Sequence, residues 1–160
     1  MDKERRVLFE DFIKIMQSLA DTAEQIGDTE NIKAVLAANR QHERLDGCIR
    51  MEQAYILKLR GLDQHRIRLA KELGWEELTF EEILEKNESR EQEILRPLFD
   101  RMKRELKRLQ ESRELSARIM NVRVYELITA IERKEGIRYD SGRKIDRGEF
   151  PYTKLCDTHA

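Results

Sequence analysis

Residues 95–131 follow one spacing, in which every step along the chain is three or four residues. The positions on this repeat are Leu95, Leu98, Met102, Leu106, Leu109, Arg113, Ser116, Met120, Val124, Leu127 and Ile131. Such spacing returns side chains to one face of a helix, and it predicts a single helix roughly 55 Å long. A helix of that length must lie along other long helices or project into solvent. Arg113 and Ser116 interrupt the apolar repeat near its middle.

The second half of this helix is apolar around most of its circumference. Its apolar residues are Ile119, Met120, Val122, Val124, Tyr125, Leu127, Ile128 and Ile131. A helix that is apolar nearly all round needs cover on more than one side. Either the other helices of this chain or another polypeptide can supply that cover, and one face can serve each.

Two earlier runs also have helical spacing. We expect the first helix from about Glu4 to Ile26 and the second from about Glu30 to Leu73. Between them, Gly27-Asp28-Thr29 can end one helix and cap the next, although a kink within one long helix fits nearly as well. For the two glycines inside the second run, Gly47 and Gly61, we expect close packing against a neighbouring helix.

A short helix is expected before the long one. Thr79-Phe80-Glu81-Glu82 has the pattern of a capping box, which predicts a helix from Phe80 to about Lys86. Ser89 with Gln92 can then start the long helix, and Pro97 either kinks it or marks its true beginning.

Helical spacing ends after Glu135, where three glycines and a proline fall within sixteen residues. The chain is therefore predicted to be all-α, an elongated antiparallel bundle or coiled coil of two to three long helices plus a short helix. We expect the bundle over 1–135 and an irregular tail over 136–160 that is flexible alone or ordered by a partner.

The composition supports long helices in one domain and a cytoplasmic location. Charged residues make up 39% of the 160 residues, and the chain has only 7 Gly and 2 Pro. No stretch reaches the ~20 apolar residues of a membrane span, and the charged N-terminus is not followed by the continuous apolar core of a signal peptide. Cys48 and Cys156 are isolated, as is typical of reduced thiols in a cytosolic protein.

Motifs that support catalysis are missing from the sequence. His42, His65 and His159 are far apart and form no metal-binding pair. The phosphate-cradling and nucleophile motifs of common enzyme classes do not occur. We therefore predict no catalytic residues, no metal site and no cofactor, and we do not expect an enzyme.

Two basic clusters lie at 96–108 and 133–147. In the first, basic residues flank the apolar positions Met102, Leu106 and Leu109, where a coiled coil carries its solvated, pairing charges. Nucleic-acid binding would need the charge on one face with aromatic or base-reading side chains, and we hold it as the weaker alternative.

Three segments together resemble one protein family. The first is MEQAYILKLRGLDQHR at 51–66, and the second is Leu73-Gly74 followed by LTFEEIL at 78–84. The third is the long last helix, followed by Tyr139 and Gly142. In this order and spacing they cover most of residues 8–142 and resemble the FlgN-type flagellar export chaperones.

The resemblance implies a cytosolic bacterial chaperone that performs no covalent chemistry. Members of that family hold the hook–filament junction proteins FlgK and FlgL before export through the flagellar type III apparatus. The implied partners are hook-associated proteins of this kind and the export apparatus. We expect no binding of nucleic acid and no insertion into a membrane. We expect the protein to be a monomer or a weak homodimer. In the family, the C-terminal part of the last helix and the following tail bind the client. The expected client-binding residues are Ile119, Met120, Val122, Val124, Leu127, Ile128, Ile131 and Tyr139.

Two other functions fit the same pattern. A structural coiled-coil protein could pair its last helix with the same helix of a second copy. A nucleic-acid-binding helical module could use the two basic clusters. Both remain as alternatives to the chaperone.

Overall fold

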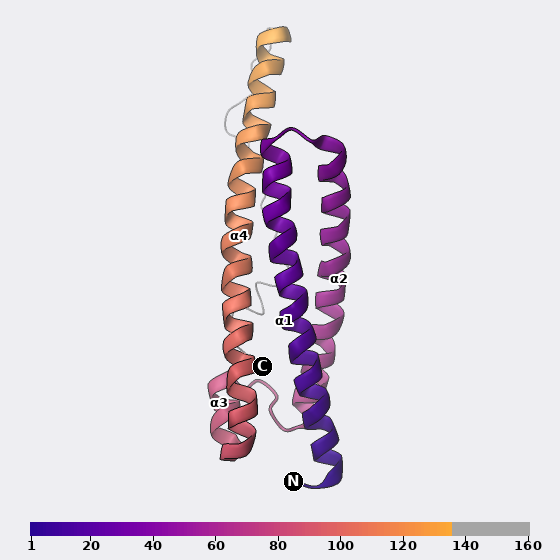
Figure 1. Ribbon diagram of the computed structural model, residues 1–160, viewed down its shortest axis with the longest axis vertical. Coiled ribbons are helices and arrows are strands. Elements are labelled where there is room, and N and C mark those ends of the chain that lie inside the picture. The colour runs from indigo at the N-terminus through magenta and orange to yellow at the C-terminus, as the bar shows by residue number, and fades with distance from the viewer. Residues whose placement is uncertain (136–160) are drawn as a thin grey trace.

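The computed structural model describes residues 1–135, which form four helices (Figure 1). These are α1 (Lys3–Ala38), α2 (His42–Glu72), α3 (Phe80–Lys86) and α4 (Ser89–Glu135). The predicted all-α bundle with one short helix is confirmed. The expected tail, 136–160, lies outside the described residues.

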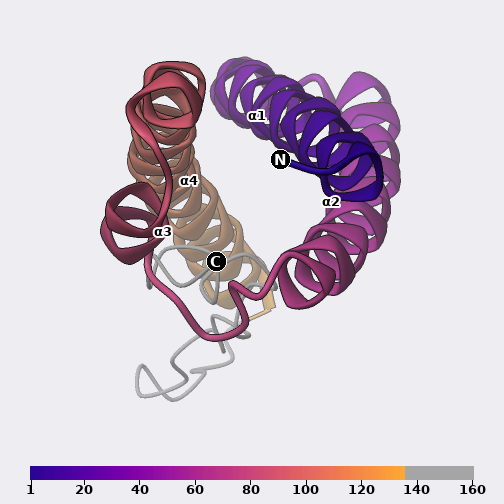
Figure 2. The same ribbon diagram turned by 90° about the horizontal axis from the view of Figure 1, so that it is seen from below.

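The helix α1 is the centre of the bundle. Both α2 and α4 pack along α1, and within residues 1–135 they do not pack against each other (Figure 2). The helices α1 and α2 are antiparallel, so the Arg5 guanidinium reaches the Leu73 carbonyl oxygen at 3.2 Å while Lys33 pairs with Glu52 towards the other end. The helix α4 runs parallel to α1, because α2 returns the chain to the base and the α2–α3 connection and α3 keep it there until α4 begins (Figure 1).

Aromatic side chains build the core at the base of the bundle. The Phe12 ring meets Trp75 edge-on at 5.1 Å and Phe99 at 6.4 Å between ring centroids. Phe80 of α3 stacks on Phe99 at 4.3 Å. Trp75 is 1% exposed, and aromatic burial of this kind is a large source of stabilisation. These rings join α1, the α2–α3 connection, α3 and α4 at one point.

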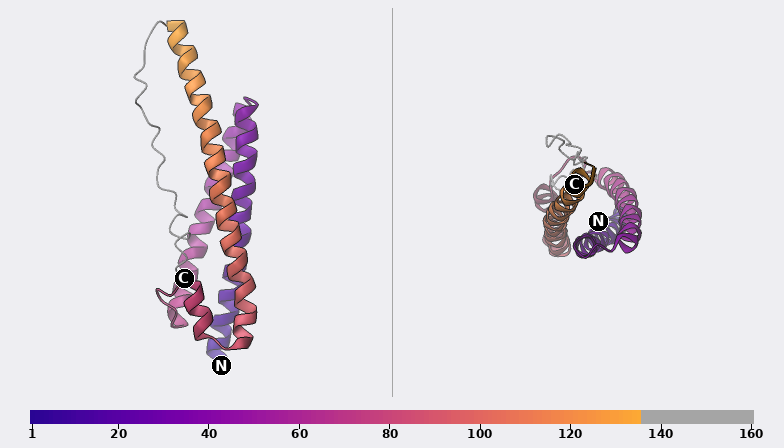
Figure 3. Two further views of the ribbon diagram at one scale, coloured as in Figure 1. Left: turned by 90° about the vertical axis from the view of Figure 1, so that its left-hand side faces the viewer. Right: turned by 90° about the horizontal axis from the view of Figure 1, so that it is seen from above.

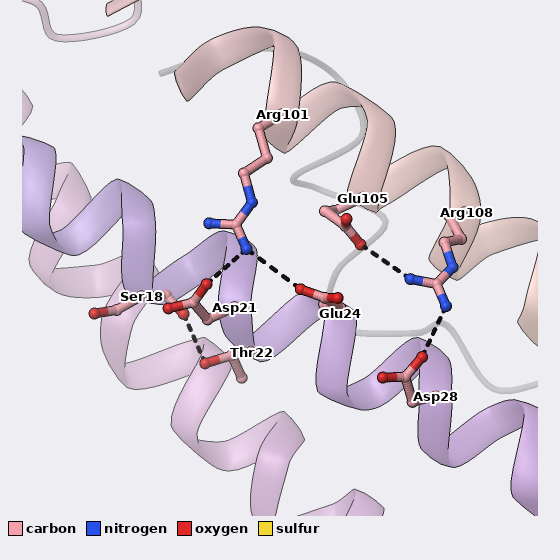
Figure 4. Close-up of polar contacts among 8 residues, drawn as sticks. All are labelled: Ser18, Asp21, Thr22, Glu24, Asp28, Arg101, Glu105 and Arg108. Atoms are coloured by element: carbon pink, nitrogen blue, oxygen red, sulfur yellow. Dashed lines mark hydrogen bonds and ion pairs between the residues drawn. The ribbon is translucent and has the colours of Figure 1, made fainter. Parts of the chain in front are cut away.

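Higher up, ion pairs line one edge of the α1–α4 interface (Figure 4). Arg101 Nη2 lies 2.6 Å from Asp21 Oδ1 and 3.3 Å from Glu24 Oε2, and Arg108 Nη2 lies 2.7 Å from Asp28 Oδ1. We call these five residues the charged ladder. The Asp21–Arg101 and Asp28–Arg108 pairs share a sequence offset of 80. A residue of α1 therefore lies near the level of the α4 residue about 80 positions later, as Gly27 beside Leu109 also indicates.

The helix break expected at Gly27-Asp28-Thr29 is wrong, whereas the alternative that the helix continues through these residues is confirmed. The helix α1 continues through Gly27-Asp28-Thr29 to Ala38, and α2 begins at His42. The three residues that resemble a stop signal serve packing instead. Gly27 is buried against α4, Asp28 pairs with Arg108, and the Thr29 hydroxyl donates to the Gln25 carbonyl oxygen at 2.7 Å.

The real turn uses residues that the sequence does not flag. Arg40 has a φ of 57°, in the left-handed region. The Gln41 amide donates to the Leu36 carbonyl oxygen at 3.0 Å, and the Arg40 amide donates to that of Ala37 at 3.2 Å. These bonds form a Schellman-type helix end, which glycine usually provides. An arginine there carries no sequence signal for a turn.

Some of the remaining local predictions are confirmed and others are wrong. The capping box of Thr79 and Glu82 is confirmed, and so is the end of α2 at Gly74, whose φ is +79°. Close packing at Gly47 and Gly61 is wrong, because both are exposed and an added Cβ would meet nothing within 4 Å. The helix α4 begins at Ser89, so Pro97 lies inside it and does not mark its start.

Candidate functional site

The helix α4 extends beyond the rest of the bundle. The offset of 80 places Ala38, the last residue of α1, level with Arg118. Residues 119–135 of α4 therefore project past α1 and the α1–α2 turn for roughly 25 Å at the helical rise per residue (Figures 1 and 3). We call this segment the overhang.

The overhang exposes large apolar side chains. Val122 is 56% exposed, Tyr125 is 70% exposed and Ile128 is 39% exposed. Residues three apart are neighbours on a helix surface, so these three side chains follow one another around α4. Ile119 and Met120 are half-buried. Of the other expected site residues, Val124, Leu127 and Ile131 belong to α4 but their side chains lie outside the described part, as does Tyr139 altogether.

Exposed apolar residues continue from the overhang onto the top of α1. Leu115 is 47% exposed, Val35 is 58% exposed and Ile32 is 54% exposed. Val35 and Leu115 keep the offset of 80, seven residues above the Asp28–Arg108 pair, so they occupy the same edge of the interface as the charged ladder. At this height of the edge, apolar side chains take the place of the charged side chains found lower down. We call Ile32, Val35, Leu115, Val122, Tyr125 and Ile128 the apolar face.

Sequence reasoning missed the α1 half of this face and Leu115. A signal was present, because Arg101, Arg108, Leu115 and Val122 are spaced by seven, as are Asp21, Asp28 and Val35. Residues seven apart return to nearly the same side of a helix. Recognising the shared edge also required knowing that α1 and α4 run parallel.

The apolar core ends below this face. Its last member on α4 among the described side chains is Leu109. Above it Arg113 is half-buried, and Ser116 is 1% exposed with a hydroxyl that has no hydrogen-bond partner in the described structure. The two polar residues that interrupt the sequence repeat thus lie between the bundle core and the overhang.

A second polar cluster lies between α1 and α2. The Lys33 ammonium donates to Glu30 Oε1 at 3.0 Å and to Glu52 Oε2 at 3.1 Å. Burial, together with the hydrogen bond and charge of Glu30, raises the pKa of Glu52 to about 7 against the opposing effect of Lys33. Burial, followed by the Glu52 charge, also raises the pKa of the Cys48 thiol, which donates to the Thr29 carbonyl oxygen at 3.5 Å.

Three of the six basic residues of the first cluster form ion pairs within the described part of the chain. Arg101 and Arg108 belong to the charged ladder, and Lys103 Nζ lies 3.1 Å from Glu81 Oε1 of α3. Their charges are therefore used, at least in part, to join α4 to α1 and α3.

Comparisons with protein-family models, with curated proteins and with solved structures found no match for this chain. In residues 1–135, no three or more His, Cys, Asp and Glu side chains gather in a way that could hold a metal ion. None of the four described helices combines the length and apolarity needed to cross a membrane.

Proposed function

We propose that this protein is a non-enzymatic export chaperone of the FlgN type. In this proposal it binds hook–filament junction proteins similar to FlgK and FlgL in the cytoplasm. It thereby keeps them from assembling before they pass through the flagellar type III apparatus. The resemblance of residues 51–66, 73–84 and the last helix supports the family.

The observation that carries the proposal is the exposed apolar surface of the overhang. Val122, Tyr125 and Ile128 are large, apolar or amphipathic, and open to solvent on a helix with no α1 beside it. Segments that assemble into a filament junction are amphipathic, and an amphipathic helix buries its apolar side against such a surface. Exposed apolar patches of this kind mark interaction sites.

The dimensions suit a helical client segment. The overhang is roughly 25 Å long, and at ~5.4 Å per turn a client helix beside it would make between four and five turns. Val35 and Leu115 extend the same surface downwards, so that a longer client helix would lie against both α4 and the end of α1.

Truncation after Arg118 tests the site. The truncated chain retains every member of the aromatic core and the whole charged ladder. We therefore expect a soluble, largely helical protein that no longer captures a FlgK-like protein on co-purification. Circular dichroism and size-exclusion chromatography check the fold of the truncated chain before capture is compared.

Two results would count against the chaperone. Undiminished capture by the truncated chain refutes the placement of the site on the overhang. Failure of the full chain to capture any hook-associated protein from a flagellated host refutes the function itself.

A self-associating structural protein is the second candidate, because a second copy could also cover the apolar face. Sedimentation over a range of concentrations distinguishes the two. A stable dimer that dissociates when Val122 and Ile128 are changed to Asp favours the scaffold, and a well-folded monomer counts against it.

A further inference from the structure

Two carboxyl groups and one ammonium group are enclosed between α1 and α2, towards the α1–α2 turn. The side chains of Glu30, Glu52 and Lys33 are 0%, 8% and 15% exposed. With both carboxyl groups ionised, the cluster would hold two negative charges against one positive charge. Burying an uncompensated charge is strongly unfavourable, and such groups change protonation state instead.

The cluster also lacks one hydrogen-bond donor. Lys33 donates to Glu30 Oε1 and to both carboxyl oxygens of Glu52, at 3.3 Å and 3.1 Å for the latter two. Glu30 Oε2 is buried and receives no donor in the described structure. A proton on Glu52 would supply a donor to Glu30 and remove the excess charge in one step. The raised pKa of Glu52 has this same origin.

The other charged or titratable groups at this level do not replace that proton. Lys33 is the group whose charge and hydrogen bond lower the pKa of Glu52. Cys48 of α2 has a raised pKa, so its thiol is neutral and adds no charge. Arg113 of α4 is half-buried near this level, but the charges that shift the pKa of Glu52 are those of Glu30 and Lys33.

We propose that Glu30 and Glu52 share one proton, carried by Glu52, and that losing it loosens α1 from α2 at their turn end. Between the cluster and the turn, the buried apolar residues are small or few: Ala34, Ala37 and Leu45. The aromatic core lies at the opposite end, so this end opens without unfolding the base. Ile32 and Val35 of the apolar face belong to the segment that moves.

The direction of the pH effect on stability follows from the raised pKa of Glu52. Glu52 has an ordinary pKa of 4.5 and a pKa of about 7 in the folded chain. Between these values the folded state holds a proton that the unfolded state has lost, so stability falls as pH rises. The stabilisation is fully present below pH 4.5 and is lost as pH rises through 7. The inference holds whatever client the protein binds.

Carboxyl-carbon NMR of the full chain tests the shared proton. We expect one glutamate resonance that titrates near pH 7 and disappears in Glu52→Gln, whose neutral amide still donates to Glu30. Glu43→Gln is the matched control, because Glu43 lies exposed on the same helix, and it should leave that resonance unchanged. If every carboxyl resonance of the unmodified chain titrates below about pH 5.5, the proposal is overturned, whether or not the variant folds.

Amide hydrogen exchange locates the opening. After correction for the intrinsic effect of pH, exchange in residues 30–52 should accelerate by more than about tenfold between pH 5 and pH 8. Residues 9–20 in the aromatic core should not follow. Glu52→Gln should remove most of the acceleration. Equal acceleration in both segments, or in Glu52→Gln and the unmodified chain, would overturn the local opening.

Discussion

At the scale of single residues, the exposure of a side chain determines whether its substitution should affect binding or stability. The side chain of Tyr125 is 70% exposed and that of Phe99 is 1% exposed, although both are aromatic residues of α4. Substitutions at exposed positions change stability by about 0.5 kcal/mol or less, whereas truncating a buried aromatic side chain removes transfer free energy and leaves a cavity. The two sites should therefore respond differently in binding and unfolding experiments.

Changing Val122 and Tyr125 to Asp together should abolish most client binding. A carboxylate on the apolar face would have to be desolvated on contact, so we expect affinity to fall by about tenfold or more, measured by calorimetry. Ile94→Asp is the control, because Ile94 is 43% exposed near the opposite end of α4. Equal losses in the control and the double variant would remove any special role for the overhang.

Phe99→Ala should destabilise the bundle without touching the binding surface. Phe99 packs against Phe12 and stacks on Phe80, so the loss should be about 3–5 kcal/mol in urea unfolding. Client affinity, measured where the variant is still folded, should stay within about twofold of that of the unmodified chain. A twofold change corresponds to a difference of about 0.4 kcal/mol in binding free energy. An unfolding free energy within about 1 kcal/mol of the unmodified chain would contradict the assigned core.

At the scale of helices, the sequence determines which residues are helical better than where each helix ends. The capping box at Thr79 and the glycine end at Gly74 were predictable, because the side chain or the φ angle itself makes the boundary. The prediction of a helix end at Gly27-Asp28-Thr29 was wrong because it used only local residue preferences. In the structure, contacts of Gly27 and Asp28 with α4 keep the helix continuous. Arg40 closes the true turn in a conformation that arginine seldom adopts.

The same limit applies to the candidate site. Periodicity alone indicated that residues 119–131 carry excess apolar surface, and the exposure of Val122 and Ile128 agrees with that reading. It did not reveal Val35 or Leu115, because their proximity depends on the parallel packing of α1 and α4. Neither did it reveal the buried Glu30–Lys33–Glu52 cluster, since glutamate and lysine at helical spacing normally lie on solvated faces.

At the scale of the whole molecule, the aromatic core and the overhang are at opposite ends of the bundle. The aromatic core fixes the base, the charged ladder fixes the offset of α1 and α4, and the overhang extends beyond both. Exposed ion pairs each contribute about 1 kcal/mol or less, so the ladder sets alignment more than stability. Within residues 1–135, no other helix lies beside the last turns of α4, so these turns should fray in isolation and gain order from a bound partner.

Amide hydrogen exchange of α4, with and without a purified FlgK-like protein, tests the central claim most directly. Without the partner, we expect residues 119–130 to exchange fastest among the helices, while residues 95–109 are protected. With the partner, we expect strong new protection over 115–128 and little change over 95–109. Protection that appears elsewhere while 115–128 still exchanges freely would contradict a client-binding role for the overhang.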